Sequence, residues 1–334
     1  MAGDTLFVFI LIGVASLLFA SGRVRLDMVA PGVLLMVVAA VLGSVTSSTA
    51  VVAILIPVTL TLSREARLPA SRLLLPMSFA ALISGMMTLI GTTPNLVVAA
   101  ELDREGYTPF GFFSFTPIGA SVLLVAVVYM VVIGRRLLPS HVADDETGGR
   151  GVRELLASFE VEGRVRRLGV PEGSSLVGQS LAGARVATRF GGRVVLIERI
   201  LPVAMALEQT GGVALVVNGL VSTFGSAGPW VMLTALFFLA AGLGLFLSNT
   251  ATAVLVAPIA IEAARVMGVD PYVFAMTVAI AASAAFMTPV STPVVTLVVE
   301  PGGYRFADFL KIGIPLVVLT WLVTLLVTPL VFGY

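Results

Sequence analysis

The stretch of sequence that decides the fold runs from residue 229 to residue 261 and reads PWVMLTALFFLAAGLGLFLSNTATAVLVAPIAI. It has no charged residue, and a polar run, Ser248-Asn249-Thr250, divides it. A transmembrane helix needs about 20 residues. The stretch is therefore too long for one span and too short for two spans joined by a water-exposed loop. It predicts a helical hairpin that enters the membrane, turns and leaves on the same side.

A second stretch, residues 28–62, has the same character and is divided by Thr46-Ser47-Ser48-Thr49. Two further apolar stretches, 73–100 and 271–299, are broken midway by runs rich in Thr, Ser and Pro. Proline cannot continue a helix and disfavours helical geometry in the residue before it. We therefore expect each of these spans to consist of two half-helices. Irregular backbone at membrane depth is tolerated only inside protein or beside a watery cavity.

The composition of the whole chain is that of a membrane protein. Of its 334 residues, 58% are apolar and 12% are charged, against about 45–50% and about 25% in soluble domains. The mean hydropathy is +1.06. These values exclude a soluble enzyme and predict an all-α polytopic membrane protein. The other apolar stretches are residues 5–20, 112–134, 200–222 and 309–333. No Lys or Arg precedes the stretch at 5–20, so we expect a retained span there and not a cleaved signal peptide.

The chain also lacks several residue types that other functions need. Its net charge is +1, so no overall field attracts nucleic acid. It has no cysteine and a single histidine, His141, in a polar stretch. Because zinc and haem sites are built from Cys and His, we expect no transition metal and no cofactor. No nucleophile–base pair can be assembled, so an enzyme is not expected.

An internal repeat relates the two halves of the chain. Matching positions follow one order, with an offset that drifts only from 201 to 194: Ser48-Thr49-Ala50 with Asn249-Thr250-Ala251, Pro57 with Pro258, Gly91 to Asn95 with Val290 to Val294, Gly106-Tyr107 with Gly303-Tyr304, and Ile118-Gly119 with Ile312-Gly313. The repeat predicts a first membrane half at 1–138, with hairpin 28–62 and broken span 73–100. It predicts a second half at 200–334, with hairpin 229–264 and broken span 271–299.

The positions of basic residues set the orientation. They follow the first span, the first hairpin and the span at 112–134: Arg23, Arg25, Arg64, Arg67, Arg72, Arg135 and Arg136. Residues 101–105 are mostly acidic and are expected outside. The repeat then occurs twice with opposite orientation, as in secondary transporters. We expect a multi-pass protein of the inner cell membrane, with residues 139–199 as a small α/β cytoplasmic insert.

The polar interruptions are where chemistry can occur. A broken helix frees carbonyls that can coordinate a hard cation, and N–H groups that attract an anion. No charged residue occurs from Val29 to Leu62, from Leu73 to Ala100 or from Gln209 to Ile261. An intramembrane proton relay normally needs such residues. Small polar residues can also serve helix packing alone, but four clusters at matching repeat positions favour a site.

At these residues the sequence resembles the divalent anion–sodium symporter family of the ion-transporter superfamily. The resemblance rests on Leu247 to Thr252, Thr88 to Asn95, Met287 to Pro293 and Pro301 to Phe306. It implies that the hairpin tips hold a small divalent anion through Ser48, Thr49, Ser248, Asn249, Thr250 and Thr292. It implies sodium, as the coupling ion, at Ser47, Ser48, Gly91, Thr92, Asn95, Ser248, Asn249, Thr288, Val290 and Ser291. A homodimer in the lipid bilayer is also implied.

The sequence departs from the family in several places. The first tip lacks an Asn, the second break has Val295 where an Asn is usual, and the chain is shorter than family members. Residues 155–199 resemble part of the regulatory C-terminal module of potassium-uptake proteins, with a strand expected at Val194 to Glu198. We expect sodium-coupled symport of a dicarboxylate or sulfate. The alternatives are a proton-linked or uncoupled transporter of oxyanions such as arsenite, and a shortened chain that does not transport.

The orientation can be tested because the chain has no native cysteine. Ala66→Cys, between the first hairpin and the first broken span, should react with an impermeant thiol reagent only from the cytoplasmic side. Reaction from the outside alone would contradict the inverted repeat, because both hairpins would lose their assigned side.

Overall fold

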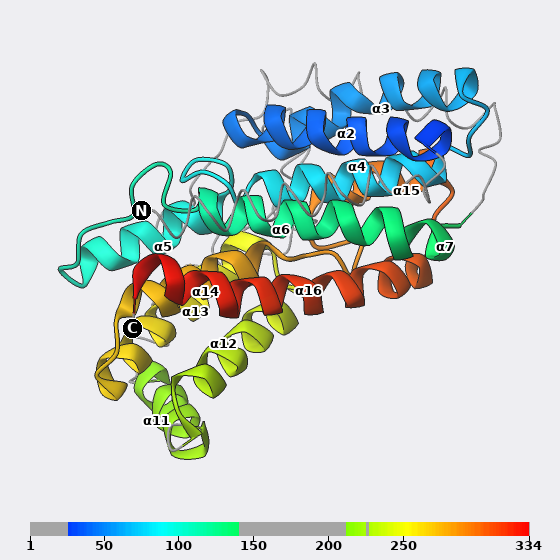
Figure 1. The fold of residues 1–334 in the computed structure, drawn as a ribbon. Helices are drawn as coiled ribbons and strands as arrows, with labels where there is room; N and C mark the ends of the chain where they lie inside the picture. The colour runs from blue at the N-terminus through cyan, green and yellow to red at the C-terminus, as the bar shows by residue number, and fades with distance from the viewer. Residues whose placement is uncertain (1–25, 140–211, 225–226, 334) are drawn as a thin grey trace, which may run out of the picture.

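The computed structural model describes residues 26–139, 212–224 and 227–333, and within these ranges it contains helices and no strand (Figure 1). The first series is α2 (Leu26–Val45), α3 (Ser48–Glu65), α4 (Ser71–Ser84), α5 (Thr93–Arg104) and α6 (Thr116–Tyr129), which continues through a π-helical turn (Met130–Gly134) into α7 (Arg135–Leu137). The second is α11 (Gly212–Phe224), α12 (Pro229–Leu243), α13 (Asn249–Met267), α14 (Pro271–Ser283), α15 (Pro293–Gly302) and α16 (Phe306–Phe332). The predicted all-α polytopic fold is confirmed.

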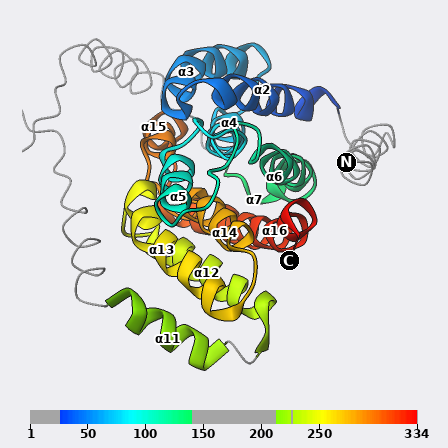
Figure 2. The same cartoon turned by 90° about the vertical axis from the view of Figure 1, so that its left-hand side faces the viewer.

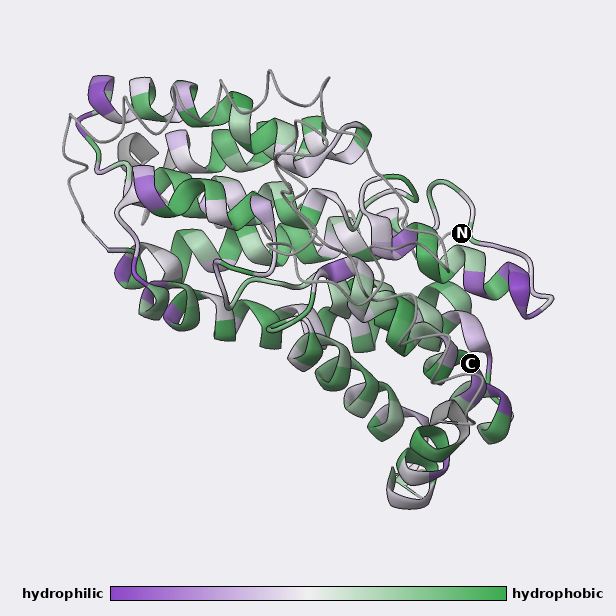
Figure 3. Cartoon of the chain, turned by 180° about the vertical axis from the view of Figure 1, so that it is seen from behind, coloured by the Kyte–Doolittle hydropathy of each residue, from purple (hydrophilic) through white to green (hydrophobic). Residues whose placement is uncertain are grey.

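Several helices suit a bilayer. Four described segments are long and apolar enough to cross a membrane, namely α3, Thr116–Gly134, α13 and α16. Hydrophilic residues gather at the two ends of the helices, and apolar residues cover the length between them (Figure 3). Large apolar side chains such as Leu34, Ile54 and Leu330 lie exposed on these helices. Because soluble proteins rarely expose so much apolar surface in one region, the chain is a membrane protein.

The two stretches expected to form hairpins each fold as two packed helices joined by a short turn. Helices α2 and α3 are separated only by Thr46 and Ser47, and α12 and α13 by residues 244–248. The helices begin and end within a few residues of the predicted limits, 28–62 and 229–264. Ser47 and Ser248 occupy the N-cap positions of α3 and α13, and Ser248 Oγ accepts a hydrogen bond from the Ala251 N–H at 3.3 Å.

The two broken stretches fold as half-helices that flank non-helical residues. Helix α4 ends at Ser84 and α5 begins at Thr93, while α14 ends at Ser283 and α15 begins at Pro293. Buried and exposed positions follow one another in the same order in residues 81–90 and in residues 281–290. Thr92 and Thr292 are the N-caps of α5 and α15. The structure thus pairs Asn95 with Val295, whereas the sequence alignment of the breaks pairs Asn95 with Val294.

The half-helices of each series pack against the other series in a reciprocal way. Helix α3 packs on α15 and α13 packs on α5, while α4 contacts α15 and α14 contacts α5. Figure 2 shows the α2–α3 pair on one side of the molecule and α11 and α12 on the opposite side, with the half-helices between them. The rings of Phe79 and Phe286 meet edge to face at 5.3 Å in this central layer. The core is therefore shared between the two series.

Hydrogen bonds place the charged segments at two opposite ends. Ser71 Oγ donates to the Pro139 carbonyl at 2.7 Å, and the Tyr304 hydroxyl donates to the Ser71 carbonyl. These bonds bring together the segments that carry Arg64, Arg67, Arg72, Arg136, Arg305 and Lys311. At the other end, the Tyr272 hydroxyl donates to the Thr108 carbonyl at 2.8 Å. That end carries mostly acidic residues: Glu101, Asp103, Glu105, Glu262 and Asp270.

Some predictions concern residues outside the described ranges. These are the span at 5–20, the insert at 139–199 with its strand at Val194 to Glu198, and the first part of the stretch at 200–222. The domain limits, the insert and the inversion of the repeat stay predictions. Helix α5 extends to Arg104, beyond the apolar limit at residue 100.

Tyr304 connects the two series through buried hydrogen bonds. Its hydroxyl accepts from the Leu75 N–H at 2.9 Å and donates to the Ser71 carbonyl, two groups that an α-helix normally joins directly. Tyr304→Phe should destabilise the fold by about 1–3 kcal/mol, because both backbone groups are buried. Thermal denaturation in detergent measures this change. The control is Tyr107→Phe, since Tyr107 makes no hydroxyl hydrogen bond to the described residues. Equal melting temperatures for both variants would contradict the role of the Tyr304 hydroxyl.

Candidate functional site

Asn95 organises the first break. The side chain lies in the first turn of α5 and is fully buried. Its Nδ2 donates to the Gly85 carbonyl at 2.9 Å and to the Thr88 carbonyl at 2.8 Å. Both carbonyls belong to the non-helical residues 85–92, so the amide holds the break in shape. The Oδ1 atom is buried and has no hydrogen-bond partner among the described residues.

The end of α2 lies against this break. Thr88 Oγ1 donates to the Ser44 carbonyl at 2.7 Å. Gly43 lies close to the side chain of Ser84, so a Cβ atom at Gly43 would force the Ser84 hydroxyl to move. The turn that contains Ser47, Ser48 and Thr49 follows directly. The first hairpin tip and the first break are therefore neighbours. A sodium site that uses both Ser47 of the tip and Gly91 of the break needs this closeness.

The second break is held by hydroxyls instead of an amide. Thr288 Oγ1 accepts from the N–H groups of Val290 and Ser291 at 3.2 and 3.3 Å, and it lies 3.2 Å from Ser291 Oγ. Thr292 Oγ1 accepts from the Val294 N–H at 3.3 Å. Val295 is buried at the position that Asn95 occupies in the first break. The two breaks have similar backbone paths but different side-chain chemistry.

The tips and breaks present helix ends to one another. Helices α3, α5, α13 and α15 all begin at a tip or a break, while α2, α4, α12 and α14 end there. The first group supplies N–H groups and partial positive charge, and the second supplies carbonyls and partial negative charge. Asn249, in the first turn of α13, has a buried Oδ1 without a partner among the described residues. Such an arrangement can hold an anion and a cation close together.

The structure brings some predicted site residues together and leaves others apart. The packing of α5 on α13 places the helix of Thr92 and Asn95 beside the helix of Asn249 and Thr250. The packing of α3 on α15 does the same for Ser48 and Thr49 with Thr292. No hydrogen bond in the described parts of the chain joins the two tips. The prediction did not include Thr252 and Ser283, whose buried hydroxyl oxygens have no hydrogen-bond partner among the described residues, although Thr252 belongs to the motif at 247–252.

Two glycines fix the position of the breaks. A Cβ atom at Gly119 of α6 would lie 2.4 Å from the Met86 carbonyl oxygen, and one at Gly313 of α16 would lie 2.4 Å from the Phe286 carbonyl oxygen. These glycines occupy matching positions of the sequence repeat. Thr116 Oγ1 also donates to the Met87 carbonyl at 2.7 Å. Helices α6 and α16 thus support the irregular backbone directly.

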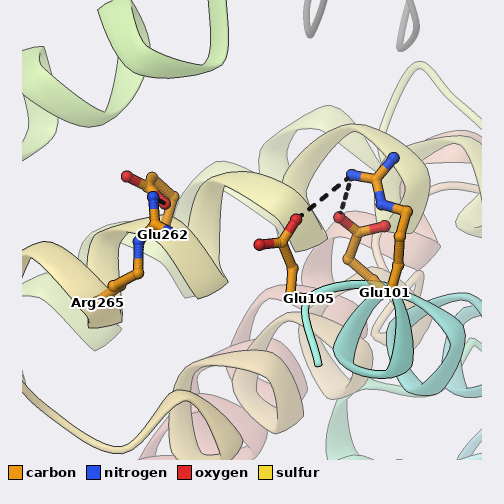
Figure 4. Close-up of polar contacts among 5 residues, drawn as sticks. Glu101, Glu105, Glu262 and Arg265 are labelled. Atoms are coloured by element: carbon orange, nitrogen blue, oxygen red, sulfur yellow. Dashed lines mark hydrogen bonds and ion pairs between the residues drawn. The ribbon is translucent and has the colours of Figure 1, made fainter. Parts of the chain in front are cut away.

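Charge is confined to the ends of the helices. Figure 4 shows Glu101 and Glu105 with Arg104 at the end of α5, and Glu262 with Arg265 at the end of α13. The ion pairs measure 2.6 Å from Arg104 to Glu101 and 2.7 Å from Arg265 to Glu262. The tips and breaks themselves carry no charged residue. The described residues include no group of three or more His, Cys, Asp or Glu that could hold a metal ion.

Paired helices with short polar turns, broken helices and an uncharged interior define a membrane transport protein. The comparisons with known proteins identify the family. The profile of the CitMHS family, described as citrate transporter, matches residues 8–278 and again residues 194–334. The chain belongs to this family, which lies within the ion-transporter superfamily. The family-level resemblance is confirmed.

The aligned share of the chain differs greatly between relatives. The uncharacterized transporter YfbS of Escherichia coli is 30% identical over 516 aligned positions, which cover 90% of this chain and 84% of that protein. The alignment is longer than this chain, so YfbS has internal segments that this chain lacks. A probable sodium/sulfate cotransporter 3 of Chlamydomonas reinhardtii is 32% identical over 128 residues, 36% of this chain and 14% of that protein. The uncharacterized transporter sll0640 of Synechocystis is 37% identical over 140 residues, 42% of this chain and 23% of that protein.

The glycine contacts predict a specific loss of stability. Gly313→Ala should destabilise the protein by about 1–3 kcal/mol, because the new methyl group meets backbone atoms that cannot move independently. The matched control is Gly242→Ala in α12, where a Cβ atom meets nothing within 4 Å. Melting temperatures in detergent should fall for the first variant and not for the second. An unchanged melting temperature for Gly313→Ala would mean that α16 does not hold the second break.

Proposed function

We propose that the protein is a secondary active transporter that carries a small divalent anion, a dicarboxylate or sulfate, together with sodium. The observation that carries the proposal is the meeting of helix N-termini and C-termini at tips and breaks that lack charged side chains. Neutral N–H groups can bind an anion, but a dianion in a low-dielectric site needs compensating charge. Sodium, bound by carbonyls and hydroxyls, supplies that charge.

The proposed anion ligands are the residues at the tips with one N-cap threonine: Ser48, Thr49, Ser248, Asn249, Thr250 and Thr292. The proposed sodium ligands combine each tip with a break: Ser47, Ser48, Gly91, Thr92 and Asn95 in the first half, and Ser248, Asn249, Thr288, Val290 and Ser291 in the second. The hydrogen bond from Thr88 to the Ser44 carbonyl supports the first of these combinations. The buried, unpartnered Oδ1 atoms of Asn95 and Asn249 support both.

We place the hairpins as re-entrant elements of an inverted repeat. The end of α2 lies beside the break between α4 and α5, and that break has helices of similar length, 14 and 12 residues, on its two sides. A turn at this level is near the middle of the span. The mostly basic end with Arg64, Arg136 and Arg305 is then cytoplasmic by the positive-inside rule. Residues 139–199 follow on the same side, and a second copy of the chain completes a homodimer in the inner membrane.

Sodium fits this interior better than protons do. A proton pathway through a membrane normally uses Asp, Glu or His, and the tips and breaks contain none. A relative in Chlamydomonas is named sodium/sulfate cotransporter 1, which points to the same ion and to a divalent anion. Transport would then depend on sodium concentration, and its pH dependence would follow the ionisation of the substrate.

Uptake of labelled succinate and sulfate into proteoliposomes tests the proposal. We expect uptake with an inward sodium gradient and none when choline replaces sodium. Asn249→Ala should abolish sodium-dependent uptake, because it removes an amide that offers a donor to the anion and an acceptor to sodium. The control is Asn218→Ala, which changes an exposed asparagine of α11 and should transport normally.

Three results would contradict the proposal in different ways. Equal uptake in choline driven by a pH gradient would establish a proton-linked transporter. Uptake of arsenite without any ion gradient would establish an uncoupled oxyanion transporter. Absence of uptake for every anion, in a protein that melts cooperatively, would establish a shortened member that does not transport, in keeping with the segments that YfbS has and this chain lacks.

A further inference from the structure

Three buried side-chain oxygens that have no hydrogen-bond partner among the described residues lie on three helices that pack against one another. They are Oδ1 of Asn95 on α5, Oγ1 of Thr252 on α13 and Oγ of Ser283 on α14. Helix α13 contacts both α5 and α14, and α14 contacts α5. All three residues are at most 1% exposed. Because buried polar atoms in proteins almost always have a partner, three exceptions on adjoining helices need an explanation.

The three oxygens lie at a similar depth. At the acidic end, Arg265 near the end of α13 and Glu105 just after α5 lie on the same side of the molecule (Figure 4), and the Tyr272 hydroxyl of α14 donates to the Thr108 carbonyl. The three helices therefore have neighbouring ends here. With a rise of 1.5 Å per residue, Asn95, Thr252 and Ser283 lie about 15, 20 and 17 Å inward from those ends. They therefore approach one level of the three-helix interface.

The usual ways of satisfying these oxygens are not used. Buried hydroxyls elsewhere bond to the preceding turn of their own helix, as Thr277 does to the Val273 carbonyl at 2.8 Å and Ser78 to the Leu75 carbonyl at 2.8 Å. Thr252 and Ser283 make no such bond. The Asn95 amide is held by the two bonds of its Nδ2 to the first break, which leaves Oδ1 on the other side.

A glycine and a further oxygen lie beside Thr252. Asn249 lies one turn earlier on the same face of α13, and its Oδ1 is also buried without a partner. Gly244, just after the end of α12, adjoins Thr252, since a Cβ atom there would lie 3.9 Å from Thr252 Oγ1. The oxygens are neutral, which suits a monovalent hard cation better than a divalent one that draws on carboxylates.

The other half of the molecule provides an internal comparison. The reciprocal trio of helices is α15, α3 and α4, and the positions that correspond to Asn95, Thr252 and Ser283 are Val295, Val51 and Ile83. These three residues are buried and apolar, with exposures of 0%, 3% and 0%. The same packing can thus be filled entirely with hydrocarbon. The polar trio occurs in one half only.

We propose that Asn95, Thr252 and Ser283, with Asn249 beside them, form a sodium site between α5, α13 and α14. It shares Asn95 and Asn249 with the tip-and-break sites of the proposed function and adds Thr252 and Ser283, and it rests on that function for the identity of the ion. It joins the first break to the second hairpin, and it has no counterpart in the other half. Bound sodium would stabilise the packing of α13 on α5.

The test measures sodium binding without any anion. The melting temperature of the purified full chain in detergent is followed as sodium chloride replaces choline chloride at constant ionic strength. The wild type should be stabilised in a saturable way. Thr252→Val, which keeps the side-chain shape, and Ser283→Ala should each raise the half-saturating sodium concentration by about tenfold or more, a loss that even indirect ligand contacts cause.

Two controls separate the site from packing. Thr252→Ser keeps a hydroxyl and should keep the wild-type sodium response. Thr328→Val makes the same substitution at another buried, unpartnered threonine, on α16, and should leave the response unchanged. If Thr252→Val and Ser283→Ala both respond to sodium as the wild type does, or if sodium does not stabilise the wild type, the proposed site is wrong. If Thr252→Val does not fold, Ser283→Ala decides.

Uptake measurements distinguish this proposal from the proposed function. Sodium-driven uptake by the wild type with the same sodium dependence in Thr252→Val would retain the function and overturn the site. Uptake that does not need sodium, together with sodium stabilisation that is lost in Thr252→Val, would overturn the function and retain the site.

Discussion

The structure depends on one constraint, which is that backbone N–H and C=O groups inside a membrane must find partners. This chain has two hairpin turns and two broken spans, and its own side chains bind several of the backbone groups that these leave free. Asn95 binds two carbonyls of the first break, Thr88 binds the end of α2, and Thr288 binds two N–H groups of the second break. Each of these bonds stabilises an irregular segment that lies between two helix ends. Stability and the candidate site therefore use the same atoms.

Much of this arrangement could be predicted from sequence because proline, glycine and small polar residues interrupt otherwise uniform apolar stretches. The hairpins, the half-helices and the polar tips follow from that pattern, and the structure places their ends within a few residues of the predicted limits. The reciprocal packing could not be predicted, because apolar faces of similar composition can pair in many ways. The role of Thr252 was missed for a related reason. A threonine in a helix usually bonds to its own preceding turn, and only the structure shows that this bond is not made.

The two halves share a backbone plan but differ in polarity. The first break uses a buried amide where the second has Val295, and the second hairpin has an Asn249 where the first has Ser48. The features that the two halves share hold the backbone in place. The features that differ, such as the buried side-chain oxygens, are the candidates for ligand binding. This difference explains why backbone-holding glycines such as Gly119 and Gly313 occur in matching positions while the buried oxygens do not.

The reciprocal packing of α3 on α15 and of α13 on α5 also has a consequence for synthesis. As the chain emerges from the ribosome, α3 and α5 are inserted long before their partners exist. During that interval the faces of α3 and α5 that pack on α15, α13 and α14 have no partner helix. The first half therefore cannot complete its packing until the second half has been translated. Truncation after residue 224 would leave these faces without their partners permanently.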